Sequence, residues 1–547
     1  MLLNKKSSFF TLLVPTILAI LMVSGCAVPQ KPQGGPKDET PPKLLKATPA
    51  NETRNFTAKK IVLQFDEYYR LVNQYQEITS SPVLEKTEFK MKGKNLEIDI
   101  KDELLNETTY AINFGKAIAD VNEGNPLKNF KYVFSTGSQI DSLKISGTVV
   151  NNLTLEKEKD VTVMLIPLKQ DSIIFGKKKP SIYATTDTSG TFSLTNLHEG
   201  DYKLYALKES AGNKIFDNDN ELLGFPGKTI HLTKDTTDIK LQLFKQIPQN
   251  FRVVDRRFEL SGKIFISFNK SLANPTLKII DPVGLDAQKL VEFTKTRDTA
   301  YLYLRSMDFD SLKVAVLDNN IALDTTKLQK DRKETFKAPL IITTSADVGN
   351  ILKPGTDLQI YASSPISGRL PSLISLKEND AYINNYTIVE DPNDAKHLIL
   401  RYRWRENVTY LLTFSEGALT GFFGEKNLNS PKRFKVDKPD NYSGMRLKVM
   451  LPDTGRAYVI ELLNEKADAT LRSDIIKKNT TIEYKNIPIG KYKVRVVYDT
   501  NRNGKWDTGS IKENRQPENI WVHPKTMILR PNFEVGEEAV VPKDATP

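Results

Sequence analysis

The stretch YDTNRNGKWDTG, residues 498–509, carries side chains that could bind a calcium ion. In a calcium loop, oxygen ligands stand at positions 1, 3 and 5, and a glycine at position 6 permits the turn. Asp499, Asn501 and Asn503 supply these oxygens, a glycine follows, and Asp507 stands at position 9. A serine occupies position 12, where a bidentate glutamate is usual. The incomplete ligand set favours a hydrogen-bonded, Asx-rich turn, and Ca²⁺ stays open as the alternative.

An earlier stretch of the chain has the same pattern. Aligning Tyr202 with Tyr492 places an acid, an asparagine, an aromatic residue and an aspartate at equivalent positions of both copies. Ala211 stands opposite Asn501, so we expect weaker calcium binding, or none, in the first copy. An aromatic residue between polar residues in both copies predicts a ring that plugs the end of a β-sandwich. The equivalent pairs are Glu209 with Asp499, Asn213 with Asn503, Phe216 with Trp506, and Asp217 with Asp507.

Residue sets typical of catalysis are missing from the sequence. The four histidines, at positions 198, 231, 397 and 523, form no metal-binding spacing. No nucleophile elbow, phosphate-binding loop or dinucleotide fingerprint occurs. We therefore predict that the protein is not an enzyme. A hydrolase would require the fold to bring a histidine to two carboxylates.

Three tryptophans offer a second kind of site. Trp404, Trp506 and Trp521 could stack against sugar rings, but aromatic residues of this kind more often fill cores or plug loops. We expect the latter, and a glycan partner stays open.

The single cysteine, Cys26, follows an apolar run at residues 9–23. The sequence Val-Ser-Gly-Cys resembles a bacterial lipobox, which implies that the signal peptide 1–25 is removed and that Cys26 is lipidated. Several acyl chains on one residue would anchor the protein stably to a membrane. Ala27 follows the cysteine rather than the aspartate associated with inner-membrane retention, which favours the outer membrane; the side of that membrane stays open. Residues 26–41 are rich in Pro, Gly and Gln and predict a tether.

The remaining composition is that of an ordinary globular protein. The chain has 547 residues, a formal charge of +11 and one cysteine, which excludes a disulfide framework. Basic residues are scattered, so we expect solvated surface charge and no nucleic-acid partner.

Short runs with a period of two predict β-strands throughout the chain. We see no sustained helical period, and the predicted fold class is all-β. The clearest runs are KIVLQF, LEIDI, YAINF and FKYVF, each bounded by polar, Gly, Asn or Pro residues.

Two families of β-sandwich are recognisable in these runs. Phe65-Asp66-Glu67, Thr109-Tyr110, Gly124-Asn125 and Phe134-Ser135-Thr136 resemble a bacterial Ig-like domain of the kind found in S-layer proteins and in Bacteroidota lipoproteins. Phe192, Leu194, Leu197, Gly200 and Tyr202 resemble a prealbumin-like or Cna-B-like sandwich. Both patterns recur further along the chain. The implied order is an Ig-like domain (42–137), a prealbumin-like domain (142–246), two Ig-like domains (248–345 and 346–437), a second prealbumin-like domain (443–535) and a tail (536–547).

Six Asp-(Ser/Thr)-(apolar or Thr) triplets resemble the glycosylation motif of exported Bacteroidota proteins, where about two would be expected by chance. The predicted acceptors are Ser142, Ser172, Thr236, Thr299, Ser311 and Thr325.

Together these features predict a non-enzymatic outer-membrane lipoprotein, built as a string of β-sandwiches behind a lipidated tether. We expect it to act as a scaffold or accessory subunit of an envelope complex, such as an assembly or transport machine. The alternative is a glycan-binding or adhesive surface lipoprotein.

Overall fold

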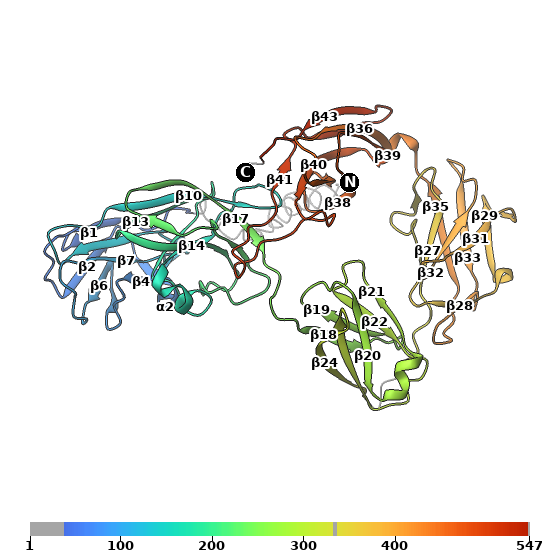
Figure 1. Cartoon of the computed structure of the whole chain (residues 1–547), viewed down its shortest axis with the longest axis horizontal. Coiled ribbons are helices and arrows are strands. Elements are labelled where there is room, and N and C mark those ends of the chain that lie inside the picture. Colours follow the sequence, from blue (N-terminus) through green and yellow to red (C-terminus); the bar gives the residue numbers. More distant parts are fainter. Residues whose placement is uncertain (1–37, 332–335, 545–547) are drawn as a thin grey trace, which may run out of the picture. The chain divides into compact units, whose positions relative to one another are not determined.

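The computed structural model describes residues 38–331 and 336–544, and the described part is built almost entirely of β-strands (Figure 1). The predicted all-β fold class is therefore confirmed. The helical segments of the described ranges have three to six residues, and none is long and apolar enough to cross a membrane. They are α2 (Gln74–Glu77), η1 (Leu168–Gln170), α3 (Asp171–Ile174), η2 (Val283–Gln288), η3 (Pro371–Leu373) and η4 (Pro439–Asn441).

The chain divides into two compact units, one of Met1–Thr79 with Val83–Gln139, the other of Ser80–Pro82 with Ile140–Pro547. The first unit has a four-stranded sheet of order β1-β2-β6-β5, together with the antiparallel pairs β3-β8 and β7-β9. Its strands are β1 (Leu44–Thr48), β2 (Lys60–Phe65), β3 (Tyr69–Leu71), β5 (Glu88–Lys92), β6 (Asn95–Asp99), β7 (Thr109–Asn113), β8 (Ile118–Asp120) and β9 (Lys131–Ser135); β4 (Thr79–Ser81) lies where the units divide.

The predicted alternation fixes the core of this first unit. Ile61, Leu63 and Phe65, the apolar positions of KIVLQF, are fully buried, while the intervening residues face away from the core. Tyr110 is also buried, and its hydroxyl accepts a hydrogen bond from the amide of Leu105 at 2.8 Å. Because the buried hydroxyl has a hydrogen-bond partner, the cost of removing it from water is offset. The bond therefore fixes the turn that precedes β7.

The second unit begins with a sheet of order β12-β11-β14-β15-β17-β10-β13, and β16 also pairs with β14. β10 and β17 run parallel, so the first and last strands of this module lie side by side. The strands are β10 (Leu143–Asn151), β11 (Thr162–Pro167), β12 (Ile182–Thr185), β13 (Thr191–Leu197), β14 (Gly200–Lys208), β15 (Leu222–Gly224), β16 (Ile230–Leu232) and β17 (Thr236–Lys245).

Two further sandwiches follow in the sequence; their strand pairs are antiparallel except for β26 and β35, which run parallel. The first has sheets β18-β19-β22-β21 and β20-β23-β24, made of β18 (Val253–Phe258), β19 (Ile264–Phe268), β20 (Pro275–Asp281), β21 (Leu290–Phe293), β22 (Thr299–Tyr303), β23 (Ser311–Asp318) and β24 (Ile321–Gln329). The second has sheets β25-β27-β32-β31, β26-β35-β33-β29-β30 and β28-β34. Its strands are β25 (Ile342–Thr344), β26 (Ile351–Leu352), β27 (Leu358–Ala362), β28 (Ile366–Arg369), β29 (Ile374–Glu378), β30 (Ala381–Ile383), β31 (Thr387–Asp391), β32 (Asp394–Arg401), β33 (Thr409–Phe414), β34 (Leu419–Gly421) and β35 (Ser430–Val436).

The border between these two sandwiches differs from the predicted one. β25 pairs with β27, and Leu340 and Ile342 are buried in the core of the second sandwich. The segment 340–345 therefore belongs with the second sandwich, not with 248–345.

The tyrosine hydrogen bond of the first unit recurs in the second sandwich, where the amide of Arg405 donates to the hydroxyl of Tyr410 at 2.8 Å.

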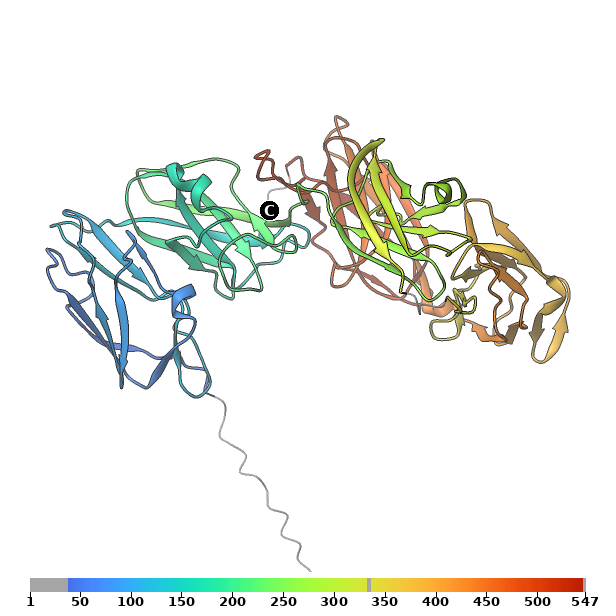
Figure 2. The ribbon, with the colours of Figure 1, turned by 90° about the horizontal axis from the view of Figure 1, so that it is seen from below.

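The last module repeats the topology of the first module of this unit. Its strands are coloured orange to dark red in Figure 2. It has sheets β39-β36-β43 and β38-β37-β40-β41, β42 pairs with β40, and β36 and β43 run parallel. In both modules a tyrosine hydroxyl donates to a carbonyl four residues earlier, Tyr202 to His198 at 2.9 Å and Tyr492 to Pro488 at 2.7 Å. The strands are β36 (Tyr442–Met450), β37 (Ala457–Asn464), β38 (Thr470–Ile476), β39 (Thr480–Pro488), β40 (Gly490–Asp499), β41 (Ile520–Val522), β42 (Met527–Leu529) and β43 (Val535–Val540).

The predicted tail at 536–547 is wrong for most of its described length. β43 forms a strand there, and Ala539 and Val541 are buried in the core of the last module. The sequence VGEEAV hides this strand because an edge strand with one face in water needs few apolar residues.

Candidate functional site

The loop after β40 is held together by its own polar side chains. The buried Asp499 carboxylate accepts hydrogen bonds from the amides of Asn503 and Gly504, at 3.0 and 2.8 Å. The side-chain amides of Asn501 and Asn503 both donate to the Asp507 carboxylate, at 2.5 and 2.6 Å. The structure thus gathers all four predicted residues, and it arranges them as an Asx-rich turn.

A fifth residue, Glu518, completes the loop from the chain that returns to β41. Its carboxylate accepts hydrogen bonds from the amides of Thr500 and Asp507, at 2.8 and 3.1 Å. Burial raises the pKa of Glu518 against the opposing effect of these two amides, and the charges of Asp507 and Asp499 raise it further. Sequence reasoning missed this residue because it lies beyond the spacing of a single calcium loop.

The earlier copy of the loop has the same hydrogen bonds. Glu209 accepts from the amides of Asn213 and Lys214, Asn213 donates to Asp217 at 2.9 Å, and Glu221 accepts from the amide of Asp217 at 3.1 Å. The predicted alignment of the two copies is therefore confirmed, and Glu221 is the counterpart of Glu518. Burial raises the pKa of Glu221 as well.

Calcium binding by Asp499, Asn501, Asn503 and Asp507 stays a prediction. Within the described ranges, no three His, Cys, Asp or Glu side chains group so as to hold a metal ion. That finding does not decide the case, because two of the four predicted ligands are asparagines. The loop contains the oxygen atoms that calcium prefers, and they already satisfy one another.

The aromatic residue of the loop, Trp506, lies between two apolar clusters. On its own module it packs against the cluster of Val459, Val497 and Ile520. It also packs against an apolar cluster of the first module of the second unit (β10–β17), together with Ile511. Its indole N–H donates to the carbonyl of Glu518 at 3.1 Å. The predicted plug at the end of a sandwich is therefore wrong for Trp506, because its ring packs between two modules. The cluster in the first module is Met164, Ile166, Tyr183, Tyr205, Leu207, Leu223, Phe225 and Phe244.

Hydrogen bonds fix the same loop to the first module of the second unit. The Thr508 hydroxyl donates to the carbonyl of Lys245 at 2.6 Å, and the Ile511 amide donates to Gln246 Oε1 at 2.9 Å. Further along, Asn514 Nδ2 donates to the carbonyl of Gly227 at 2.8 Å, and Gln516 Nε2 donates to that of Phe225 at 2.9 Å. We call residues 499–518 the clasp, because this segment bonds two modules that are far apart in the sequence.

The contact is reciprocal. Leu155, from the first module, packs against the cluster of Val459, Val497 and Ile520 on the last module. Arg495 Nη1 donates to the carbonyl of Leu153 at 2.9 Å, and its Nε bonds Glu461 at 2.7 Å. Each module therefore covers an apolar sheet face of the other.

A signal for this contact exists in the sequence. The runs VTVMLIP at 161–167 and AYVIELL at 457–463 are apolar at consecutive positions, unlike the alternating strands elsewhere. Such runs are typical of strands buried on both faces. The second buried face of β11 and of β37 lies at this contact, where Met164 and Val459 are each nearly inaccessible.

The other predicted sites remain separate from the clasp. Cys26, the signal peptide and the tether up to residue 37 lie outside the described residues, so lipidation stays a prediction. Among the predicted glycosylation acceptors, three are exposed and three are partly buried, and their modification also stays a prediction. The exposed ones are Ser142, Ser172 and Thr325; the partly buried ones are Thr236, Thr299 and Ser311.

The remaining tryptophans fill cores, as predicted. Trp404 packs edge-on against Tyr410, with the two ring centroids 4.9 Å apart. Trp521 packs against the core of the last module. The sugar platform made of tryptophans is therefore not supported.

The four histidines bond to four different sets of partners. His198 pairs with Asp141 at 3.1 Å, and His231 pairs with Asp201 at 2.6 Å. His397 is placed between Asp391 and Gln359, and His523 contacts two backbone carbonyls.

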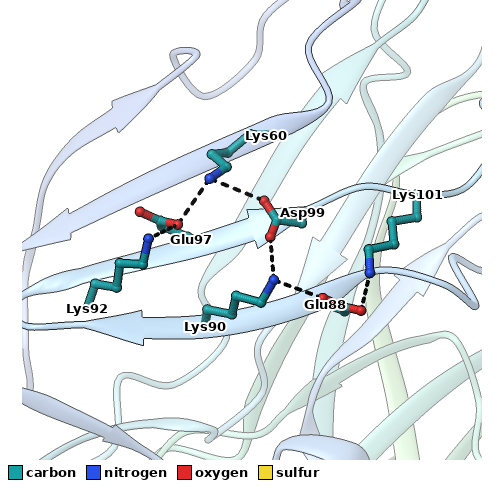
Figure 3. A network of polar contacts seen from close by, with 7 residues as sticks. All are labelled: Lys60, Glu88, Lys90, Lys92, Glu97, Asp99 and Lys101. Atoms are coloured by element: carbon teal, nitrogen blue, oxygen red, sulfur yellow. Dashed lines mark hydrogen bonds and ion pairs between the residues drawn. The ribbon is translucent and has the colours of Figure 1, made fainter.

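A network of charges covers one face of the first unit (Figure 3). Lysines and acids alternate across β2, β5 and β6, and each lysine drawn is paired. The face is thus close to neutral, and exposed pairs of this kind add little to stability. Their position suits the edge strand β5, because charged side chains discourage pairing with another chain. The members are Lys60, Glu88, Lys90, Lys92, Glu97, Asp99 and Lys101.

Residues 38–136 match the bacterial Ig-like domain family. No curated protein matches the chain. Similar solved structures include BcpA, the major pilin subunit of Bacillus cereus, at 12% identity over 74% of this chain and 99% of that chain, with a TM-score of 0.14. They also include the TIE protein of Bacillus anthracis, at 10% identity over 93% of this chain and 75% of that chain, with a TM-score of 0.14. The surface layer protein SbsC, domains 1–6, matches at 10% identity over 89% of this chain and 67% of that chain, also with a TM-score of 0.14. Superpositions this weak carry no inference about activity.

Proposed function

We propose that the chain is a non-enzymatic structural and adhesive protein of a bacterial cell surface, anchored through a lipid on Cys26. The clasp is the observation that carries this proposal. Thr508 and Ile511 bond a module that lies far away in the chain, and Trp506 buries its ring there. Such a fixed contact suits a protein that holds binding faces at set positions.

The chemistry of the described residues supports the same proposal. The histidine–carboxylate pairs of His198 and His231 are open to water, with histidine side-chain exposures of 77% and 73%. His397 is shielded, at 12%, but both of its ring nitrogens are taken up by Asp391 and Gln359. General acid–base catalysis works best where such a pair is shielded from water and set against a bound substrate. The Ig-like domain at 38–136 is in keeping with a binding or spacing role.

The proposal is tested in cells that express the full chain. The wild type should fractionate with the outer membrane and be degraded when intact cells are treated with protease, whereas Cys26→Ala should appear in the soluble fraction. Beads coated with the purified wild type should adhere to envelope material or host surfaces. Protection from protease in intact cells would contradict a surface location. Stoichiometric co-purification of an outer-membrane protein, without adhesion, would favour the scaffold role in an envelope complex.

A further inference from the structure

A cleft of about 540 Å³ opens at one end of the first module of the second unit. Its size is in the range of small-molecule sites. The helical turn η1 lines one side with Leu168, Lys169 and Gln170, and the opposite side is formed where β14 pairs with β16. Pro167 and Leu168 give it an apolar side, Leu168 remains 39% exposed although it is apolar, and the buried Tyr202 and Leu232 lie beneath the cleft.

Polar groups also line this cleft. Asp201 and His231 face each other across β14 and β16 at 2.6 Å, with side-chain exposures of 55% and 73%. Glu199 lies two residues before Asp201 and lines the same cleft, as do Lys169 and Gln170. Asp201 is the carboxylate that the fold pairs with this histidine. Because this pair is open to water, its groups are available for hydrogen bonds to a ligand.

The last module shows that the fold does not require these residues. In the equivalent register, Lys491 pairs with Ile528 where the first module has Asp201 and His231. The long connection of residues 168–181 is replaced by the short turn 465–469, where Glu465 pairs with Lys491 at 3.0 Å. The cleft and its polar rim are thus additions to one copy of a repeated module.

We propose that this cleft binds a neutral saccharide. Sugars present hydroxyls, which carboxylate, amide and imidazole groups bind by hydrogen bonds. They also present apolar faces, which pack on apolar side chains such as Pro167 and Leu168. The cleft is lined by two carboxylates and one lysine. The excess negative charge disfavours binding of phosphate, sulfate and uronic acids, since like charges repel. An inorganic cation would gain nothing from the apolar side chains. This inference rests on the proposed adhesive function and supplies its ligand class.

The test uses the purified full-length lipoprotein in detergent, applied to arrays of neutral and acidic oligosaccharides, with titration calorimetry on those retained. The wild type should bind neutral oligosaccharides, and Asp201→Ala with His231→Ala should weaken that binding at least tenfold. The matched control, Lys491→Ala with Ile528→Ala, changes the equivalent positions of the last module and should bind like the wild type. All four side chains are at least partly exposed, so both variants should keep the circular dichroism of the wild type.

Three outcomes would overturn the inference. They are retention of no neutral oligosaccharide at millimolar concentration, retention of acidic ones only, or equal binding by the wild type and the cleft variant. None of these would affect the proposed surface function if the protein is still cleaved on intact cells and the beads still adhere. Loss of cleavage and adhesion, with saccharide binding intact, would instead contradict the proposed function alone.

Discussion

Gly509 offers the sharpest test of the clasp. A Cβ at this position would lie 2.5 Å from Phe244 Cζ and 2.8 Å from two further atoms of that ring. Phe244 is 2% exposed, so the ring has no free space into which it could move. Overpacking of this kind costs about 1–3 kcal/mol. Gly509→Ala should therefore weaken the contact between the modules without touching the hydrogen bonds of the loop itself.

Hydrogen exchange of the full chain, read by mass spectrometry, measures this effect. The amide of Ile511 bonds Gln246 across the contact, so its exchange reports opening of the clasp. A cost of about 1–3 kcal/mol corresponds to exchange about 5- to 150-fold faster over residues 508–516. Gly536→Ala is the matched control, because nothing lies within 4 Å of its added Cβ. Unchanged exchange in Gly509→Ala, or equal acceleration in both variants, would refute the clasp.

Three further predictions concern the loop and the repeated tyrosine. If the loop binds calcium, the full chain should melt at a higher temperature in calcium than in chelator. At a hundredfold excess of calcium over Kd, the added stability should be about 2.7 kcal/mol, and Asp499→Ala with Asp507→Ala should remove it. A calorimetric melt that does not change with calcium would end the metal interpretation. Since the pKa of Glu518 is raised in the folded state, its favourable contribution is complete below the ordinary value of 4.5 and is lost as pH rises through the raised pKa. Urea melts from pH 4 to 8 should therefore show the wild type losing stability relative to Glu518→Gln as pH rises, and the opposite slope would contradict the assignment. Tyr410→Phe leaves the amide of Arg405 without its partner and should lower the free energy of unfolding by about 1–3 kcal/mol in urea melts, whereas no change would show that water replaces the hydroxyl.

The sequence predicted the strands well where one face of the strand meets water. Ile61, Leu63 and Phe65 alternate in KIVLQF and are all buried, because a half-buried strand must repeat every two residues. The repeat of Tyr110 at Tyr410 was likewise visible, since both tyrosines make the same local bond. Short-range patterns of this kind are set by neighbours in the chain.

Features that depend on distant residues could not be predicted in the same way. Thr508 bonds the carbonyl of Lys245, and no local pattern links two residues so far apart. Glu518 joins the loop only because β41 returns beside β40. Both follow from tertiary pairing, which the loop sequence does not contain.

The two copies of the loop use the same hydrogen-bonded turn for different contacts. In the first copy Phe216 stacks near Phe175 and stays on its own module. In the second copy the same hydrogen-bonded turn presents the larger Trp506, which reaches the apolar cluster of the other module while still packing on its own. Because both turns are closed by equivalent carboxylates, Glu221 and Glu518, the ring can change without loss of the turn. The polar residues of YDTNRNGKWDTG thus hold a rigid turn, and the tryptophan within it determines which surface the turn joins.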